Sequence, residues 1–176
     1  MKKYLLFLLF ASTIIFGQAK EFPLKNEDFS QIVLNKQIYF EGEISKDSPF
    51  KLKFENIVKN PYKPNMYFVS GLTEVEGNQA KFLGEIIFTE KYDVRDSPDK
   101  MLVFGDFNLI ENKSGEHSGI FKGKFRMQIN KDLKPLNENF STITFKGKWK
   151  NYIGNLDFDV WWANYTPTNI SKIIFK

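Results

Sequence analysis

The chain has 176 residues, of which 42% are hydrophobic and 16% aromatic, with no cysteine, one histidine and a formal net charge of +4. This hydrophobic content exceeds that of disordered chains, and the length suits a single folded domain. The lack of cysteine excludes disulfide frameworks, thiol catalysis and cysteine zinc sites, and a lone histidine excludes a histidine-rich metal centre. We therefore expect neither a metal nor a cofactor.

The first 19 residues have the pattern of a secretory signal peptide. Lys2 and Lys3 provide the positive start, residues 4–16 form an apolar run, and Gly17 and Ala19 have the spacing of a signal peptidase site. That run is shorter than the roughly 20 residues of a transmembrane helix, so we expect no transmembrane segment. Together with the lack of cysteine, this predicts an exported bacterial protein, periplasmic or secreted. Its mature chain has a net charge of +2, because two lysines leave with the signal peptide.

Residues 20–36 precede the strands and contain the one predicted helix, over residues 26–35. Asn26 is a capping residue type, and Phe29, Ile32 and Val33 would share one helix face. A helix of this size suits one end of a β-barrel, which we predict for residues 37–176.

The rest of the chain alternates apolar and polar residues, which is the period of half-buried strands. We predict eight strands, over residues 37–44, 50–58, 66–76, 79–89, 100–111, 115–129, 141–152 and 155–164. Residues 91–99 and 130–140 are predicted loops. Consecutive antiparallel strands in this length predict an all-β, up-and-down meander that closes into a barrel, and a two-sheet sandwich is the alternative.

Six of these strands have a glycine in the same phase as the flanking large apolar residues. The glycines are Gly42, Gly71, Gly84, Gly105, Gly123 and Gly147. Because glycine weakens a strand, this repetition predicts strands that bend strongly or pack closely along one inner belt. A two-residue turn at residues 77–78 would place Gly71 opposite Gly84, and a three-residue turn at residues 113–115 would place Gly105 opposite Gly123.

The order of signal peptide, short N-terminal segment and glycine-centred meander ending in Gly147-Lys148-Trp149 resembles small secreted bacterial lipocalin-like barrel proteins. The resemblance covers most of the mature chain and implies the barrel fold. Lipocalins carry Gly-x-Trp near the first strand, whereas here it falls on the seventh, so no functional residue is carried over.

The preferred interpretation is an exported, non-catalytic binding protein that holds an apolar or amphipathic small ligand or a partner in the cell envelope. Aromatic side chains beside the glycines would line a ligand cavity. These candidate ligand-binding residues are Phe82, Phe107, Phe121, Phe125 and Trp149. Trp161, Trp162 and Tyr165 offer further stacking surfaces, and strand alternation lets only one of the two tryptophans face the interior.

A basic ladder lies on the glycine-free face of the sixth and seventh predicted strands. Its members are Lys122, Lys124, Arg126, Lys146, Lys148 and Lys150. Contact with an anionic envelope component is the functional interpretation. Nucleic acid is not expected, because no aromatic residues alternate with the lysines and an exported protein does not meet it.

An apolar patch lies on the same face of the third to fifth predicted strands. It includes Met66, Phe68, Leu72, Leu83, Ile87 and Phe104. The predicted register places Leu72 opposite Leu83 and Phe68 opposite Ile87. Such a patch needs a cover, from the N-terminal helix, from the apolar tail at residues 170–175 or from a second copy of the chain in a homodimer. The last case defines an alternative function, an interaction protein that pairs through this sheet face.

A further alternative is a glycan-active hydrolase. Asp157 and Asp159 lie two apart on one predicted strand, so their carboxylates project from one face about 7 Å apart. That spacing is compatible with the paired carboxylates of glycoside hydrolysis. His117 is predicted at the surface beside a turn, where Ser118 points away from it, and no catalytic residue is assigned.

Overall fold

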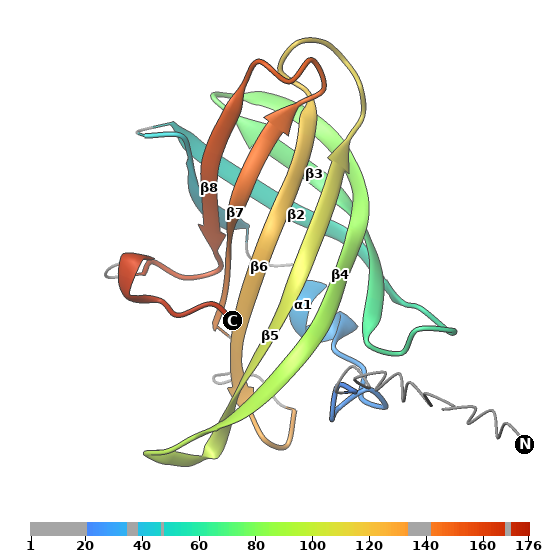
Figure 1. The fold of residues 1–176 in the computed structure, drawn as a ribbon, viewed down its shortest axis with the longest axis vertical. Coiled ribbons are helices and arrows are strands. Elements are labelled where there is room, and N and C mark those ends of the chain that lie inside the picture. The colour runs from blue at the N-terminus through green and yellow to red at the C-terminus, as the bar shows by residue number, and fades with distance from the viewer. Residues whose placement is uncertain (1–20, 35–38, 47, 134–141, 168–169) are drawn as a thin grey trace, which may run out of the picture.

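Eight antiparallel strands follow one another around a closed barrel in the computed structural model (Figure 1). Each strand pairs with its neighbours in sequence, and β1 pairs with β8 to close the ring. The structure describes residues 21–34, 39–46, 48–133, 142–167 and 170–176. The predicted meander is confirmed as a barrel rather than a sandwich, whereas the predicted signal peptide and residues 134–140 of a predicted loop lie outside the described residues.

The strand bounds lie close to those expected from the alternation. The strands are β1 (Phe40–Ile44), β2 (Pro49–Lys59), β3 (Met66–Val75), β4 (Asn78–Val94), β5 (Ser97–Glu111), β6 (Gly119–Asn130), β7 (Thr142–Asn151) and β8 (Asp157–Ala163). The predicted loop at residues 91–99 is wrong, because β4 continues to Val94 and β5 begins at Ser97. The Tyr92 ring packs against Phe104 with 5.7 Å between centroids, which favours the extended hairpin over a loop.

The turn between β3 and β4 begins one residue earlier than predicted. Glu76 and Gly77 occupy it with φ angles of 51° and 82°, so Val75 pairs with Asn78. Two positive φ angles are typical of a type I′ hairpin, in which the pair of central residues sets the register. Gly71 therefore lies opposite Phe82 and not opposite Gly84.

Other predicted pairings change as well. Leu72 lies opposite Lys81, and Phe68 lies opposite Glu85. Between β5 and β6, residues 112–118 form a longer loop than the predicted three residues, and Gly105 consequently pairs with Phe125. The glycine-to-glycine pairs predicted across these two hairpins are thus both wrong.

The glycine belt is nevertheless a line of close approach between strands. Gly123 lies directly opposite Gly147. A Cβ atom added to Gly123 would come 2.2 Å from the carbonyl oxygen of Lys146 and 2.5 Å from the Cα of Gly147. Such distances are too short for any side chain, so glycine permits the tight curl of the barrel wall.

Aromatic rings fill the middle of the barrel. Phe145, which is fully buried, stacks on Trp162 with 5.1 Å between ring centroids. It also meets the rings of Phe40, Phe54 and Phe107 at 5.5 to 5.9 Å. Packed side chains therefore occupy this part of the lumen.

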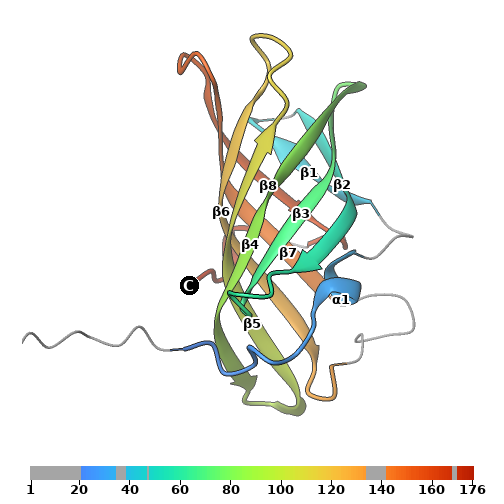
Figure 2. The same cartoon turned by 90° about the vertical axis from the view of Figure 1, so that its right-hand side faces the viewer.

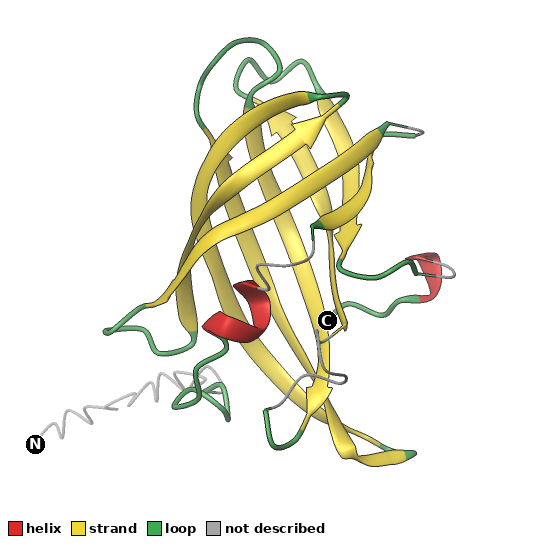
Figure 3. Cartoon of the chain, turned by 180° about the vertical axis from the view of Figure 1, so that it is seen from behind, coloured by secondary structure: helices red, strands yellow, loops and turns green. Residues whose placement is uncertain are grey.

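A short helix, α1 (Ser30–Leu34), lies at the end of the barrel where β2 ends (Figures 2 and 3). It is shorter than predicted, because Asp28 rather than Asn26 caps it by accepting a hydrogen bond from the Ser30 backbone N–H at 2.8 Å. A second, 3₁₀ helix spans Ile170–Lys172. Within the described ranges, no helix has the length and apolar character that a membrane crossing requires.

Residues 21–34, which we call the N-terminal plug, bury their apolar side chains in this end of the barrel. Phe29 and Val33 are buried, as predicted for the helix face. The Phe29 ring stacks on Phe88 from β4 with 4.7 Å between centroids. The plug therefore completes the core at this end.

Candidate functional site

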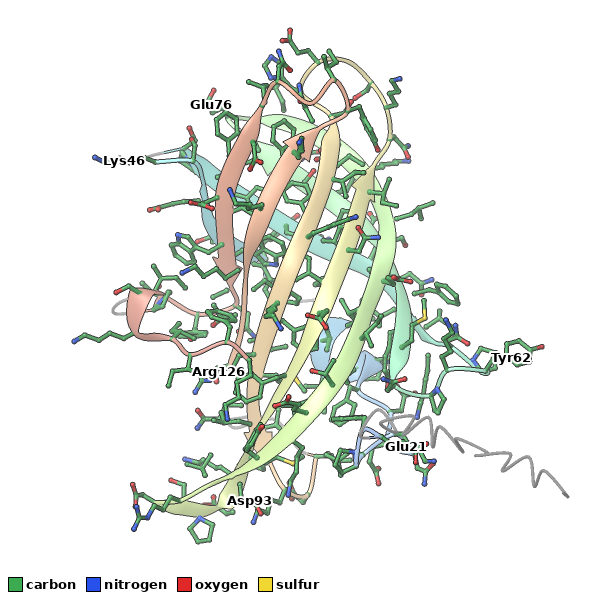
Figure 4. All side chains as sticks on the ribbon, viewed as in Figure 1. Glu21, Lys46, Tyr62, Glu76, Asp93 and Arg126 are labelled. Carbon is green, nitrogen blue, oxygen red and sulfur yellow. The ribbon has the colours of Figure 1, made fainter. Side chains whose placement is uncertain are left out.

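The end of the barrel opposite the N-terminal plug contains a cavity of about 610 Å³, which we call the mouth cavity. Figure 4 labels Glu76 and Lys46 at this end, far from Glu21 and Asp93. Every strand except β2 contributes to the lining, together with the loop at residues 112–118. Its volume lies within the range of small-molecule pockets in proteins.

Aromatic and aliphatic side chains form one part of the lining. The apolar lining residues are Ile44, Val75, Ala80, Phe121, Trp149 and Phe158. Trp149 and Phe158 stack in parallel, with 5.9 Å between ring centroids and 2° between ring planes. Both rings line the cavity, and we call this pair its aromatic wall.

Glu111, the last residue of β5, is the buried acid of this cavity and is only 5% exposed. Its Oε1 accepts a hydrogen bond from the Thr73 hydroxyl at 2.6 Å. Its Oε2 accepts hydrogen bonds from the Trp149 indole N–H and the Gly119 backbone N–H, each at 3.0 Å. These donors hold the carboxylate in one orientation.

Among the described residues, Glu111 has no basic counterpart. Within the described part of the chain, the ion pairs do not include Glu111. An ionised carboxylate offers about four acceptor positions, so three hydrogen bonds leave one free, on Oε1. The cavity therefore contains an oriented anion with remaining capacity to accept.

The turn after β7 packs against the same acid. The Tyr152 hydroxyl donates a hydrogen bond to the backbone carbonyl of Glu111. Burial raises the pKa of the Tyr152 hydroxyl, and the Glu111 carboxylate raises it further. The Asn151 side-chain amide donates to the carbonyl of Glu116 at 3.1 Å, so the loop at residues 112–118 is tied to the β7–β8 turn.

The five predicted ligand-binding residues divide between the cavity and the core. Phe121 and Trp149 line the mouth cavity. Phe82, Phe107 and Phe125 do not line it and pack in the interior of the barrel. The structure therefore brings two of the five to the cavity.

Sequence reasoning missed Glu111 and Thr73, although a signal for both was present. Glu111 continues the inward phase of Gly105, Phe107 and Leu109 along β5, and Thr73 continues the inward phase of Gly71 along β3. A charged residue in the inward phase of a barrel strand is unusual, because burial of a charge needs hydrogen-bond partners. This pattern would have identified the site.

The basic ladder lies on the outer face as predicted, and its lysines face one another across β6 and β7. Lys122 pairs with Lys148, and Lys124 pairs with Lys146. Lys124 also lies 3.6 Å from Asp106. Arg126 and Lys150 instead lie opposite Thr144 and Ile120.

Asp157 and Asp159 act as counterions to this ladder. Their carboxylates lie 3.1 Å and 3.5 Å from the ammonium group of Lys148. The hydrogen bond from Lys148 to Asp157 is the main cause of a raised pKa of Lys148. Both acids are on the outer face, and neither lines the mouth cavity.

The outer apolar patch is partly covered by the chain itself. Phe68 and Leu83 are 50% and 64% exposed. The other four residues are buried or half-buried, namely Met66, Leu72, Ile87 and Phe104. Tyr92 packs on Phe104, and the ammonium group of Lys176 lies 3.7 Å from the centroid of the Tyr92 ring. The C-terminal end therefore reaches this side of the barrel wall (Figure 1).

The two adjacent tryptophans point in opposite directions, as the alternation predicted. Trp162 is fully buried in the lumen, whereas Trp161 faces outward and donates a hydrogen bond to Glu43 at 3.2 Å. Trp161 lines a groove of about 520 Å³ on the outside of β1 and β8, together with Tyr39 and Tyr165.

Comparison of the chain with protein-family models, with curated proteins and with solved structures finds no match. The resemblance to lipocalin-like proteins therefore stays a prediction.

Proposed function

We propose that this protein is an exported, non-catalytic binding protein that holds a small amphipathic ligand in the mouth cavity. The observation that carries the proposal is the combination of an aromatic wall, Trp149 and Phe158, with the buried, hydrogen-bonded carboxylate of Glu111 in one cavity of about 610 Å³. Largely apolar pockets with a few convergent polar groups are typical of small-molecule sites.

The packed core limits how far a ligand would enter. Because the rings around Phe145 and Trp162 fill the middle of the lumen, the ligand would occupy only the open end. Its apolar part would lie against Phe121, Trp149 and Phe158, and its polar part would face Glu111. This predicts a compact ligand rather than a long acyl chain extending through the barrel.

The hydrogen bonds around the cavity support a preformed site. Glu111 is held by Thr73, Gly119 and Trp149, and the loop at residues 112–118 is held through Asn151. A preformed site loses less conformational entropy when the ligand binds, which favours affinity. Export is supported by the signal-peptide pattern of residues 1–19.

The test measures binding of N-phenyl-1-naphthylamine, a small aromatic probe whose fluorescence increases in apolar surroundings. Ala80 lines the cavity, and Ala80→Phe would fill part of it. Lys81→Phe adds the same ring to the outer face of the same strand and is the matched control. We expect wild type and Lys81→Phe to bind the probe and Ala80→Phe to lose binding at least tenfold, with folding verified by circular dichroism. Absence of binding to wild type, or equal binding by both variants, would contradict the proposal.

The alternative functions receive less support from the geometry. Asp157 and Asp159 both form ion pairs with Lys148 on the outer wall of the barrel, and this structural role accounts for both carboxylates. The apolar patch is interrupted by Lys81 and Glu85, which face it from β4.

Contact of the basic ladder with an anionic surface is favoured by one observation. Lys122 and Lys146 stand beside like charges, and neither forms an ion pair with a carboxylate among the described residues.

Sedimentation with phospholipid vesicles tests that second candidate. If the ladder contacts anionic surfaces, the protein binds phosphatidylglycerol vesicles at low salt, and Lys122→Ser with Lys146→Ser weakens binding several-fold. Equal sedimentation of wild type and double variant would count against it.

A further inference from the structure

We infer that the mouth cavity selects a cationic amphiphile, in which a protonated amine attached to a compact apolar body lies against Glu111. This inference rests on the proposed function and adds the charge of the ligand to it. Three observations support it: the sign of the charged groups around the cavity, the free acceptor position of Glu111, and the position of the aromatic wall.

Among the described residues that line the cavity, the acidic side chains are Glu76, Glu111 and Glu116. Glu76 and Glu116 lie at its exposed rim, and Glu111 lies buried below them. His117 is the one other ionisable side chain of the described lining, which contains no lysine or arginine. The ammonium group of Lys113, in the loop beside the cavity, lies over the Tyr152 ring, 6.0 Å from its centroid. An anionic ligand would therefore meet only like charge in the cavity, apart from the exposed imidazole.

Glu111 provides the specific contact. A carboxylate that is 5% exposed interacts with charge in a medium of low effective dielectric, where attraction to a cation is stronger than in water. A protonated amine would supply both a donor for the free position on Oε1 and a compensating charge. A neutral hydroxyl would supply the donor alone, so the protonated amine should bind more tightly than the corresponding alcohol.

The aromatic wall lies next to this carboxylate. The Trp149 indole N–H donates to Glu111, and the face of the same indole stacks on Phe158. A ligand whose amine lies at Glu111 is therefore held beside the aromatic wall. The apolar body of the ligand can then pack on Phe121 and Phe158 without leaving the carboxylate.

Glu111→Gln removes the charge and keeps the hydrogen bonds. The glutamine oxygen replaces Oε2 and accepts from Trp149 and Gly119. The amide replaces Oε1 and donates to Thr73, whose hydroxyl then donates to the carbonyl of Ala80, at 3.3 Å. This variant should fold with an unchanged cavity shape, so a change in binding reports on charge.

The experiment compares three ligands that share a naphthalene ring and differ in the charge of the attached group. They are 1-naphthylmethylamine, which is a cation when protonated, the neutral alcohol 1-naphthylmethanol, and the anion of 1-naphthylacetic acid. Calorimetric titration at neutral pH should show the amine binding to wild type about tenfold or more tightly than the alcohol, with no measurable binding of the acid. Glu111→Gln should bring amine and alcohol to within about threefold of each other. Glu74→Gln is the matched control, because Glu74 faces outward from β3 near the same end, and it should keep the preference of wild type.

The outcomes separate this inference from the proposed function. Equal binding of amine and alcohol to wild type, or tighter binding of the acid, would overturn the selection of a cation while the binding function stands. Binding of none of the three, together with failure of N-phenyl-1-naphthylamine, would overturn the proposed function itself. If Glu111→Gln does not fold, the comparison of the three ligands on wild type decides alone.

Discussion

The hydroxyl group of Tyr67 lies 3.1 Å from the backbone nitrogen of Phe29, and this contact joins the barrel wall to the N-terminal plug. The same hydroxyl donates to the backbone carbonyl of Glu27, also at 3.1 Å. Tyr67 is 1% exposed, so one buried side chain satisfies two backbone groups of the plug.

Tyr67→Phe should therefore loosen the plug. The buried Phe29 N–H loses its partner, whereas the Glu27 carbonyl keeps its hydrogen bond from Lys59, and we expect the free energy of unfolding to fall by about 1–3 kcal/mol. Urea denaturation measures this change. Tyr62→Phe is the control, because Tyr62 is 91% exposed and its replacement should leave the transition unchanged. Equal effects of the two variants would show that the contact does not stabilise the plug.

The same tyrosine predicts a loss of stability in alkaline solution. Burial raises the pKa of Tyr67 from 10.0 to about 12. Because the folded-state pKa is the higher one, the stabilisation is complete below pH 10 and disappears as the pH rises through 12. Denaturation at a series of pH values should show wild type losing more stability over this window than Tyr67→Phe. Equal losses of stability by wild type and Tyr67→Phe between pH 10 and pH 12 would contradict a role for Tyr67 in this pH dependence.

The close approach at Gly123 predicts a large effect from a single methyl group. Gly123→Ala places a Cβ 2.2 Å from a backbone carbonyl oxygen, so the strands must separate, at a cost of about 1–3 kcal/mol in the free energy of unfolding. Gly77→Asn is the control. Gly77 has a φ of 82°, which strains asparagine less than most residues, and an added Cβ would meet nothing within 4 Å, so this replacement should cost less. If alanine at position 123 is as well tolerated as asparagine at position 77, the belt is not needed for closure.

Two buried tryptophans allow a matched test of the Glu111 network. Trp149 donates its indole N–H to Glu111, whereas the indole nitrogen of Trp162 has no hydrogen-bond partner among the described residues. Replacement by phenylalanine removes the same atoms at both positions. Trp149→Phe should cost about 1 kcal/mol more than Trp162→Phe in urea denaturation, because it takes a donor from a buried carboxylate. A larger cost at Trp162 would contradict the network.

The strand order and approximate bounds could be predicted from alternation, but the register could not. A choice between Glu76-Gly77 and Gly77-Asn78 as the turn moves the partner of Gly71 by two residues, and both dipeptides contain a turn-forming glycine. The mouth cavity depends on this register and on the length of the loop at residues 112–118. Glu111 was nevertheless visible as a charge in the inward phase of its strand.

Asp157 and Asp159 give a test of the hydrolase alternative. Replacing both by asparagine should leave the fold intact and lower the pKa of Lys148 towards its ordinary value, since Asp157 is the main cause of the rise. Nitrogen-15 NMR titration of the lysine side chain measures this shift. A broad glycan panel should show no hydrolysis by wild type or by the double variant. Hydrolysis by wild type that disappears in the double variant would favour an enzyme over a binding protein.

The three tryptophans report on three different places, which makes their indole N–H signals the most direct test of the binding site. Trp149 lies in the mouth cavity, Trp161 in the outer groove and Trp162 in the packed core. A titration of nitrogen-15-labelled protein with 1-naphthylmethylamine should shift the Trp149 signal strongly and leave that of Trp161 in place. A shift confined to Trp161, or no shift at Trp149 at saturating ligand, would contradict binding in the mouth of the barrel.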